Sequence, residues 1–163
     1  MTAKTKLEAL FQRTTSNGWA LVPLRLIIGY GFAAHGYAKL ARGPESFATI
    51  LAALGLPAPS VTAWVTSLLE LVGGASLMAG AAVIPLSVPL GITMLTAMFM
   101  VHFPYGFSSI RLKAIDAGGA QFGPVGYEIN LLYLGGLLAL VLGGAGPWSV
   151  DRWLARRRSA TVA

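Results

Sequence analysis

Four stretches of apolar residues, each close to the length needed to cross a membrane, dominate the chain. They cover residues 19–40, 61–83, 86–103 and 127–145. A helix needs about 20 predominantly apolar residues to span the hydrocarbon core. The pattern therefore predicts an all-α integral membrane protein built as a four-helix bundle. The second and third helices are joined by a very short link at Ile84-Pro85, and Pro23 and Pro89 fall in the first turns of the first and third helices.

The first loop between these stretches carries a helix signal of its own. Pro44 and Glu45 follow Gly43 as a helix start, and Gly55 is a stop. Apolar residues at helical spacing lie between them, so we expect a short helix on the outer membrane interface. A second interfacial helix is expected over residues 6–13. The long segment 104–126 is expected to be a loop, and loops of this length are usually functional or disordered.

Basic residues flank the apolar stretches at both ends of the chain. Such residues remain in the cytoplasm, and an even number of spans places both termini on one side. We therefore expect a multi-pass membrane protein with both termini in the cytoplasm. It divides into an N-terminal segment (1–18), a four-helix domain (19–146) and a basic tail (147–163). The flanking basic residues are Lys4, Lys6, Arg13, Arg152, Arg156, Arg157 and Arg158.

Composition supports the membrane interpretation. Of 163 residues, 55% are hydrophobic and 11% are charged, whereas a soluble domain has about a quarter of its residues charged. The net charge of +6 is explained by the topology-setting flanks, so lipid rather than nucleic acid is the expected partner. Absence of cysteine removes disulfides, thiolate nucleophiles and zinc–thiolate sites. The chain also lacks phosphate-loop and dinucleotide-binding motifs.

Ionisable residues inside the apolar stretches mark candidate sites, because a charge at the bilayer centre costs about 3 kcal/mol and normally faces a partner. Near the middle of the second stretch, an isolated Glu70 carboxylate would take up a proton or find a cation. Arg25 starts nearer the cytoplasmic end of the first stretch and has a long side chain. The sequence therefore predicts a structural ion pair between Arg25 and Glu70.

A second group of polar residues is expected at one depth near the outer leaflet. Two imidazoles, a carboxylate and an ammonium there could bind a quinone head group, a metal or an anionic substrate. The alternative is that each side chain simply reaches to the interface. Two histidines with a carboxylate also match an iron(II) ligand set, although a metal is the weaker interpretation. The group contains His35, Lys39, His102, Tyr127, Glu128 and Asn130.

Several short motifs resemble those of the DoxX family of small bacterial membrane proteins. They are LRLIIG at 24–29, HG at 35–36 with KL at 39–40, GLP at 55–57, ELVGG at 70–74, VHFPYGF at 101–107 and GYE at 126–128. Together they extend over about residues 21–151. The family's polar motif positions correspond here to Arg25, His35, Lys39, Glu70, His102 and Glu128.

The resemblance implies a four-helix bundle in the bacterial plasma (inner) membrane and a redox function. The family is named for a relative of quinone-reducing subunits that oxidise thiosulfate in an archaeon. Some bacterial members are associated with a membrane oxidoreductase complex and with oxidative-stress defence. Because this chain has no cysteine, any cysteine-dependent variant of the family chemistry is in doubt.

The first functional hypothesis is a quinone-linked redox subunit with a polar site near the outer leaflet. His35 or His102 would hydrogen-bond the quinone, Glu128 would pass protons, and Lys39 and Tyr127 would complete the binding site. Electrons would come from a partner protein or directly from a substrate. The sequence leaves open whether the chain is an enzyme, and quinone is the one cofactor it suggests.

Two other functions remain open. One is a non-catalytic accessory or scaffold protein, in which Arg25 and Glu70 matter for folding and the outer histidines do not. The other is a small-solute or proton carrier. Four helices are few for a carrier, so a homo-oligomer would have to enclose the pathway, with small-residue faces such as Gly135-Gly136 at the contacts.

Overall fold

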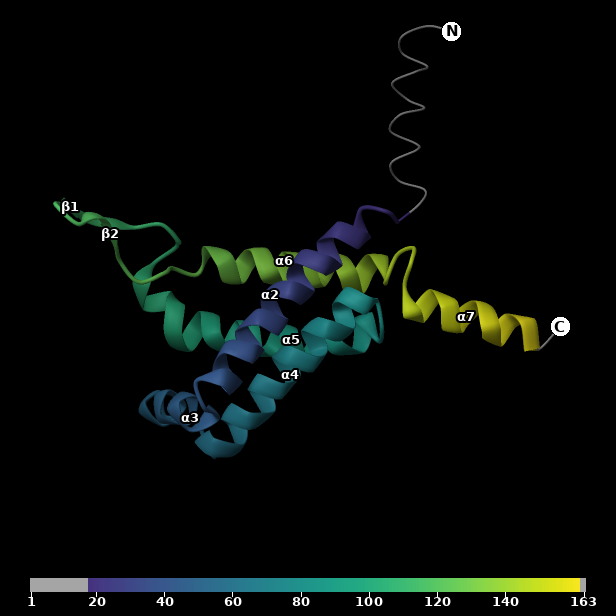
Figure 1. Ribbon diagram of the computed structural model, residues 1–163, viewed down its shortest axis with the longest axis horizontal. Helices are drawn as coiled ribbons and strands as arrows, with labels where there is room; N and C mark the ends of the chain where they lie inside the picture. Colours follow the sequence, from purple (N-terminus) through teal and green to yellow (C-terminus); the bar gives the residue numbers. More distant parts are fainter. Residues whose placement is uncertain (1–17, 162–163) are drawn as a thin grey trace, which may run out of the picture.

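A computed structural model describes residues 18–161, and within this range the protein is mostly helical. The N-terminal helix expected over residues 6–13 lies outside the described residues. Two short helical turns, a π-turn (Met98–His102) and a 3-10 turn (Phe103–Tyr105), extend α5, and a two-stranded sheet follows. The α-helices are α2 (Leu21–Ala41), α3 (Pro44–Ala53), α4 (Pro59–Ala79), α5 (Val83–Ala97), α6 (Glu128–Gly143) and α7 (Val150–Thr161) (Figure 1).

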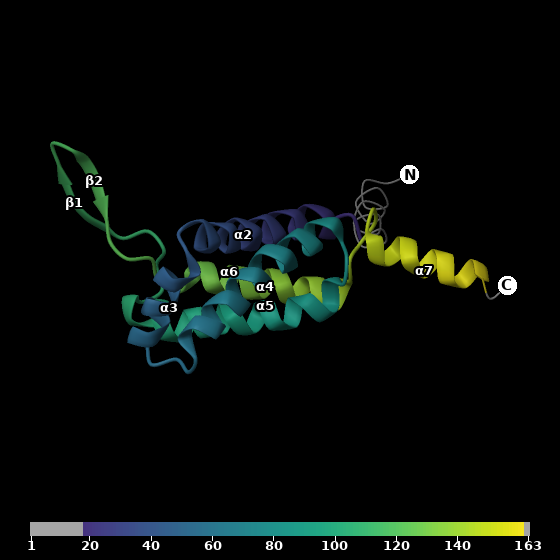
Figure 2. The ribbon, with the colours of Figure 1, turned by 60° about the horizontal axis from the view of Figure 1, so that its bottom comes forward.

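Helices α2, α4, α5 and α6 pack against one another. The most extensive contact is between α2 and α4, followed by α5 with α6, while α4 also contacts α5 and α2 contacts α6. In Figure 2 both ends of the described chain lie at one end of these helices, which we call the terminal end, and β1 and β2 project beyond the other, the hairpin end. The core between the helices is small and apolar. It contains Ile28, Phe32, Leu77, Val83, Leu90, Leu137 and Leu140.

Each of the four predicted apolar stretches forms a helix. Two helical segments within the described residues, Pro59–Ala79 and Val83–Tyr105, are long and apolar enough to cross a membrane. Arg25, His35 and Lys39 lower the hydropathy of α2, and α6 is apolar but has only 16 residues.

The turn between the second and third helices differs from its prediction. It lies at Gly80–Ala82, not at Ile84-Pro85, and Ala82 adopts a left-handed backbone conformation with φ of 49°. Because α5 begins three residues earlier than expected, Pro85 occupies its first turn and Pro89 lies inside the helix. Pro89 therefore removes one helical hydrogen bond rather than capping the start.

An exposed hairpin within the predicted long loop makes the all-α prediction incomplete. Strands β1 (Leu112–Asp116) and β2 (Gly119–Phe122) pair antiparallel. Asp116 organises the turn by accepting hydrogen bonds from the backbone N–H of Gly118 at 2.8 Å and from Gln121 Nε2 at 2.6 Å. The basic tail, for which no structure was predicted, forms α7.

Two charged residues tie the terminal end together. Arg25, only 3% exposed, donates hydrogen bonds to the carbonyl oxygens of Ala145 and Trp148, both at 2.5 Å. Asp151 accepts from the backbone N–H groups of Ala82 at 2.7 Å and Val83 at 3.0 Å. These N–H groups begin α5 and have no partner within that helix, so a carboxylate from the far end of the chain caps it.

Glycines allow α2 and α4 to approach until their backbones touch. A Cβ atom at Gly29 would lie 2.6 Å from the Gly74 carbonyl oxygen and 2.9 Å from the Met78 nitrogen. At Gly36 a Cβ would meet the backbone of Ser67 and Leu71. Small residues at such crossings are typical of helix pairs in membranes. These contacts fix how far one helix is shifted along the other.

The substitution Gly29→Ala should lower the free energy of unfolding by about 2 kcal/mol, because its methyl group overpacks a backbone contact that cannot move without separating the helices. Thermal unfolding in detergent would measure the loss. Gly135→Ala, in α6, is the matched control because no atom outside its own helix lies within 4 Å of the added carbon. Equal melting temperatures for the two variants would contradict the close-contact assignment.

Candidate functional site

A cavity of about 640 Å³ opens between the helices at the hairpin end. Its walls come from α2, α3, α4, α5 with its π-turn, and α6, and they are mainly apolar. Phe32 and Ile92 belong to the long helices, while Leu51 and Leu54 lie in and just after α3. The short helix expected to lie on the interface therefore supplies one wall of the cavity.

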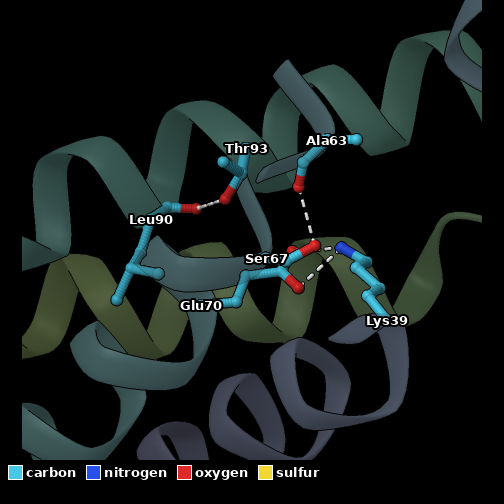
Figure 3. A network of polar contacts seen from close by, with 6 residues as sticks. All are labelled: Lys39, Ala63, Ser67, Glu70, Leu90 and Thr93. Atoms are coloured by element: carbon cyan, nitrogen blue, oxygen red, sulfur yellow. Dashed lines mark hydrogen bonds and ion pairs between the residues drawn. The ribbon is translucent and has the colours of Figure 1, made fainter. Parts of the chain in front are cut away.

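An ion pair lies in this wall. Lys39 Nζ donates to both carboxylate oxygens of Glu70, at 2.7 and 2.6 Å, and the Glu70 side chain is 9% exposed (Figure 3). The ammonium also lies 4.5 Å from the centroid of the Phe47 ring. One turn before Glu70, the Ser67 hydroxyl donates to the Ala63 carbonyl oxygen at 2.7 Å (Figure 3).

The predicted partner of Glu70 was wrong. Gly29 lies against Gly74 and Gly36 lies near Ser67, so the two helices run antiparallel with a fixed shift. Glu70 consequently comes level with Lys39, whereas Arg25 comes level with Gly80 at the terminal end. Periodicity places residues on a face, but it does not give the shift between two helices.

The π-turn positions His102 at the cavity. Its Nδ1 atom lies 3.0 Å from the Val125 carbonyl oxygen, and both residues line the cavity. A π-turn inserts an extra residue into a helix and often occurs at functional sites. His35, from α2, also lines the cavity and is exposed at its opening. Four members of the expected polar group, His35, Lys39, His102 and Asn130, thus line the cavity, together with Glu70.

Tyr127 and Glu128 do not line the cavity. Tyr127 stacks on Phe103 with ring centroids 5.6 Å apart, and Glu128 Oε2 accepts a hydrogen bond from the Ser109 N–H at 3.0 Å. Both residues therefore organise the loop before α6.

The residues proposed as weak metal ligands, His35, His102 and Glu128, do not form a ligand set. Across residues 18–161, no three histidine or carboxylate side chains are placed to hold a metal ion. Glu128 is drawn away into the loop by its bond to Ser109.

The sequence analysis missed the threonines of the cavity. Thr62 and Thr66 precede Glu70 at intervals of four, on the face of α4 that lines it, and Thr93 and Thr96 line it from α5. The spacing 62, 66, 70 was a visible signal, because a hydroxyl stripe leading to a carboxylate in an apolar helix marks a polar face. An apolar cavity with a few polar groups is suited to a lipophilic molecule that carries a polar head.

Loss of the lysine charge should destabilise the protein. Lys39→Met leaves the Glu70 carboxylate without a counter-charge at a largely buried position, which costs about 3 kcal/mol. The double variant Lys39→Met, Glu70→Met should recover most of this loss, because neither charge remains. Thermal unfolding in detergent would compare the stability of the single and double variants. A double variant no more stable than the single one would show that the pair is not coupled.

Comparison with known proteins identifies the family of this chain. The DoxX family model matches residues 20–103, which include α2, α3, α4 and α5 with its π-turn. The uncharacterized membrane protein Rv3486 of Mycobacterium tuberculosis is 29% identical over 152 residues, covering 86% of this chain and 85% of that protein. No solved structure matches the chain significantly. The chain belongs to the DoxX family of membrane proteins.

Proposed function

We propose that α2, α4, α5 with its two terminal turns, and α6 all cross the bacterial plasma membrane, with both termini in the cytoplasm. Large apolar side chains are exposed on all four, among them Ile27, Val65, Ile92 and Leu132. A soluble protein rarely exposes continuous apolar faces of this kind, whereas lipid covers them at no cost. The terminal end carries the basic residues of α7 and the Trp19–Trp148 pair, whose ring centroids lie 4.9 Å apart. Both features are expected at a cytoplasmic interface.

This topology predicts distinct behaviour for two reporters. Green fluorescent protein fused after the C-terminal residue should fluoresce, because it folds in the cytoplasm. Alkaline phosphatase inserted at Gly118, in the turn of the hairpin, should be active, because it requires the periplasm. Cell fluorescence and phosphatase activity give the answer. A dark fluorescent protein at the C-terminus together with inactive phosphatase at Gly118 would contradict this orientation.

Within that membrane protein we propose a quinone-linked role, in which the cavity binds a lipophilic molecule with a polar ring. The observation that carries this proposal is the cavity of about 640 Å³, mainly apolar and lined by His35, the Lys39–Glu70 pair and His102. Its volume lies within the range of small-molecule sites. An apolar tail would lie along Phe32 and the α3 wall, and the polar ring would face the histidines.

The ionisable groups have different roles in this proposal. Lys39 Nζ lies 2.6 Å from Glu70 Oε2, so the two charges neutralise each other. The cavity therefore offers a polar surface without net charge, which suits a neutral ligand. His35 and His102 supply ring nitrogens that can exchange hydrogen bonds with it. Tyr127 and Glu128 hold the adjoining loop in place. Electrons would pass to or from a partner protein, which makes the chain a subunit rather than a complete oxidoreductase.

Filling the cavity should abolish binding. Ala97→Phe places a ring in the space that the ligand would occupy, because Ala97 lines the cavity. In lipid nanodiscs, we expect the affinity for the decylbenzoquinone/decylhydroquinone couple to fall at least about tenfold, which corresponds to 1.4 kcal/mol.

The control is Ala75→Phe, the same change at an exposed position of α4 that does not line the cavity. It should bind like the unchanged protein. Equal binding by all three proteins, or no binding by any, would contradict the proposed site.

A further inference from the structure

Three of the four threonines that line the cavity donate their hydroxyl protons to backbone carbonyl oxygens. Thr62 Oγ1 donates to the Pro57 carbonyl oxygen at 3.0 Å, Thr93 Oγ1 to that of Leu90 at 2.8 Å, and Thr96 Oγ1 to that of Ile92 at 2.9 Å. A hydroxyl group has one proton and two lone pairs. Each of these oxygens can therefore offer a ligand only an acceptor.

The amide group of Asn130 also donates to the protein. Its Nδ2 atom donates to Met94, with the sulfur at 3.0 Å and the carbonyl oxygen at 3.4 Å. Asn130 is buried and lines the cavity, and its Oδ1 atom makes no hydrogen bond within residues 18–161. The atom left for a ligand is again an acceptor.

The imidazole of His102 is fixed by its partner. Because the Val125 carbonyl can only accept, the Nδ1 atom 3.0 Å from it must carry the proton. In the neutral ring, Nε2 is then unprotonated and is an acceptor. It has no hydrogen-bond partner in the described part of the chain, although the residue lines the cavity.

The Lys39 ammonium, the strongest donor of the cavity, is also occupied. Its hydrogen bonds go to both oxygens of Glu70, and it lies over the Phe47 ring. His35, Thr66 and Tyr133 make no hydrogen bond among the described residues and can act either way. Three threonines, Asn130 and His102 therefore spend donors on the protein and present acceptors, and Lys39 spends two of its three N–H groups on Glu70.

We propose that the cavity selects lipophilic ligands that carry hydroxyl groups, such as the reduced, dihydroxy form of a quinone or a similar phenol, over the carbonyl or ether form. His102 Nε2 and Thr96 Oγ1 are specificity-determining acceptors. A carbonyl ligand would bring no proton to these two acceptors and would lose the hydrogen bonds that the hydroxyl form gains. A site built to bond a hydroxyl group rejects analogues that lack it. The inference rests on the proposed function, because it assumes a lipophilic ligand in this cavity.

The test compares ligands that differ in one hydroxyl proton. In nanodiscs, para-nonylphenol should bind about tenfold more tightly than para-nonylanisole, which has a methyl group in place of the proton. Decylhydroquinone should exceed decylbenzoquinone by a similar factor under anaerobic conditions. Because decylhydroquinone and decylbenzoquinone do not differ by a methyl group, a preference in this pair cannot be caused by the added bulk of that group.

Variants assign the selectivity to residues. His102→Leu and Thr96→Val each remove one acceptor and should lower the phenol-to-anisole ratio severalfold. Thr96→Val keeps the shape of the side chain, so it covers the case in which His102→Leu fails to fold. Thr49→Val is the control, because Thr49 bonds the Glu45 carbonyl oxygen at 3.1 Å in the same way but lies outside the cavity.

The outcomes separate this inference from the function on which it rests. Equal binding of phenol and anisole that is lost in Ala97→Phe would overturn hydroxyl selection and leave the lipophile site intact. A ratio that neither His102→Leu nor Thr96→Val changes would overturn the assignment of these acceptors. If neither ligand binds the unchanged protein, both proposals fail together.

Discussion

The contact between α2 and α4 sets the position of nearly every other functional group. With Gly29 and Gly36 on one helix and Gly74 on the other, the two backbones meet directly, so neither helix can slide along its partner without a clash. That fixed shift brings Lys39 level with Glu70 and leaves Arg25 at the opposite end. The ion pair is thus a consequence of backbone packing, and its charges are balanced where water is scarce.

The two ends of the molecule use charge in different ways. At the terminal end, Arg25 and Asp151 bind backbone groups at helix ends and turns, so they hold the chain in place. At the hairpin end, Lys39 and Glu70 bind each other in the wall of a cavity. Their mutual neutralisation leaves the cavity apolar overall, and the hydrogen-bonding character of the site then falls to uncharged threonine, asparagine and histidine side chains.

The cavity also depends on elements that interrupt regular helices. Helix α3 folds back over the opening with Leu51 buried against Ala63 of α4. The π-turn at Met98–His102 places His102 within hydrogen-bonding distance of Val125. Without these two features the same four long helices would still pack, but the walls and the polar groups would not converge on one space.

The sequence by itself determined the apolar helices, the short helix after Gly43, the membrane setting and the family. It also determined four of the residues that line the cavity, namely His35, Lys39, His102 and Asn130. Hydrophobic runs and helix-start residues act on nearby residues of the chain, so their effects can be recognised from the sequence alone. The hairpin was missed because its strands are wholly exposed and carry no apolar–polar alternation that a buried face would impose.

Only the tertiary structure decided which charges meet and which polar atoms remain free for a ligand. The partner of Glu70 depends on the shift between two helices, and the cap of α5 comes from Asp151, 68 positions along the chain from Val83. Whether Thr96 or His102 offers a donor or an acceptor depends on the carbonyl each one reaches. These pairings depend on distances between residues far apart in the sequence, which residue type and spacing alone do not give.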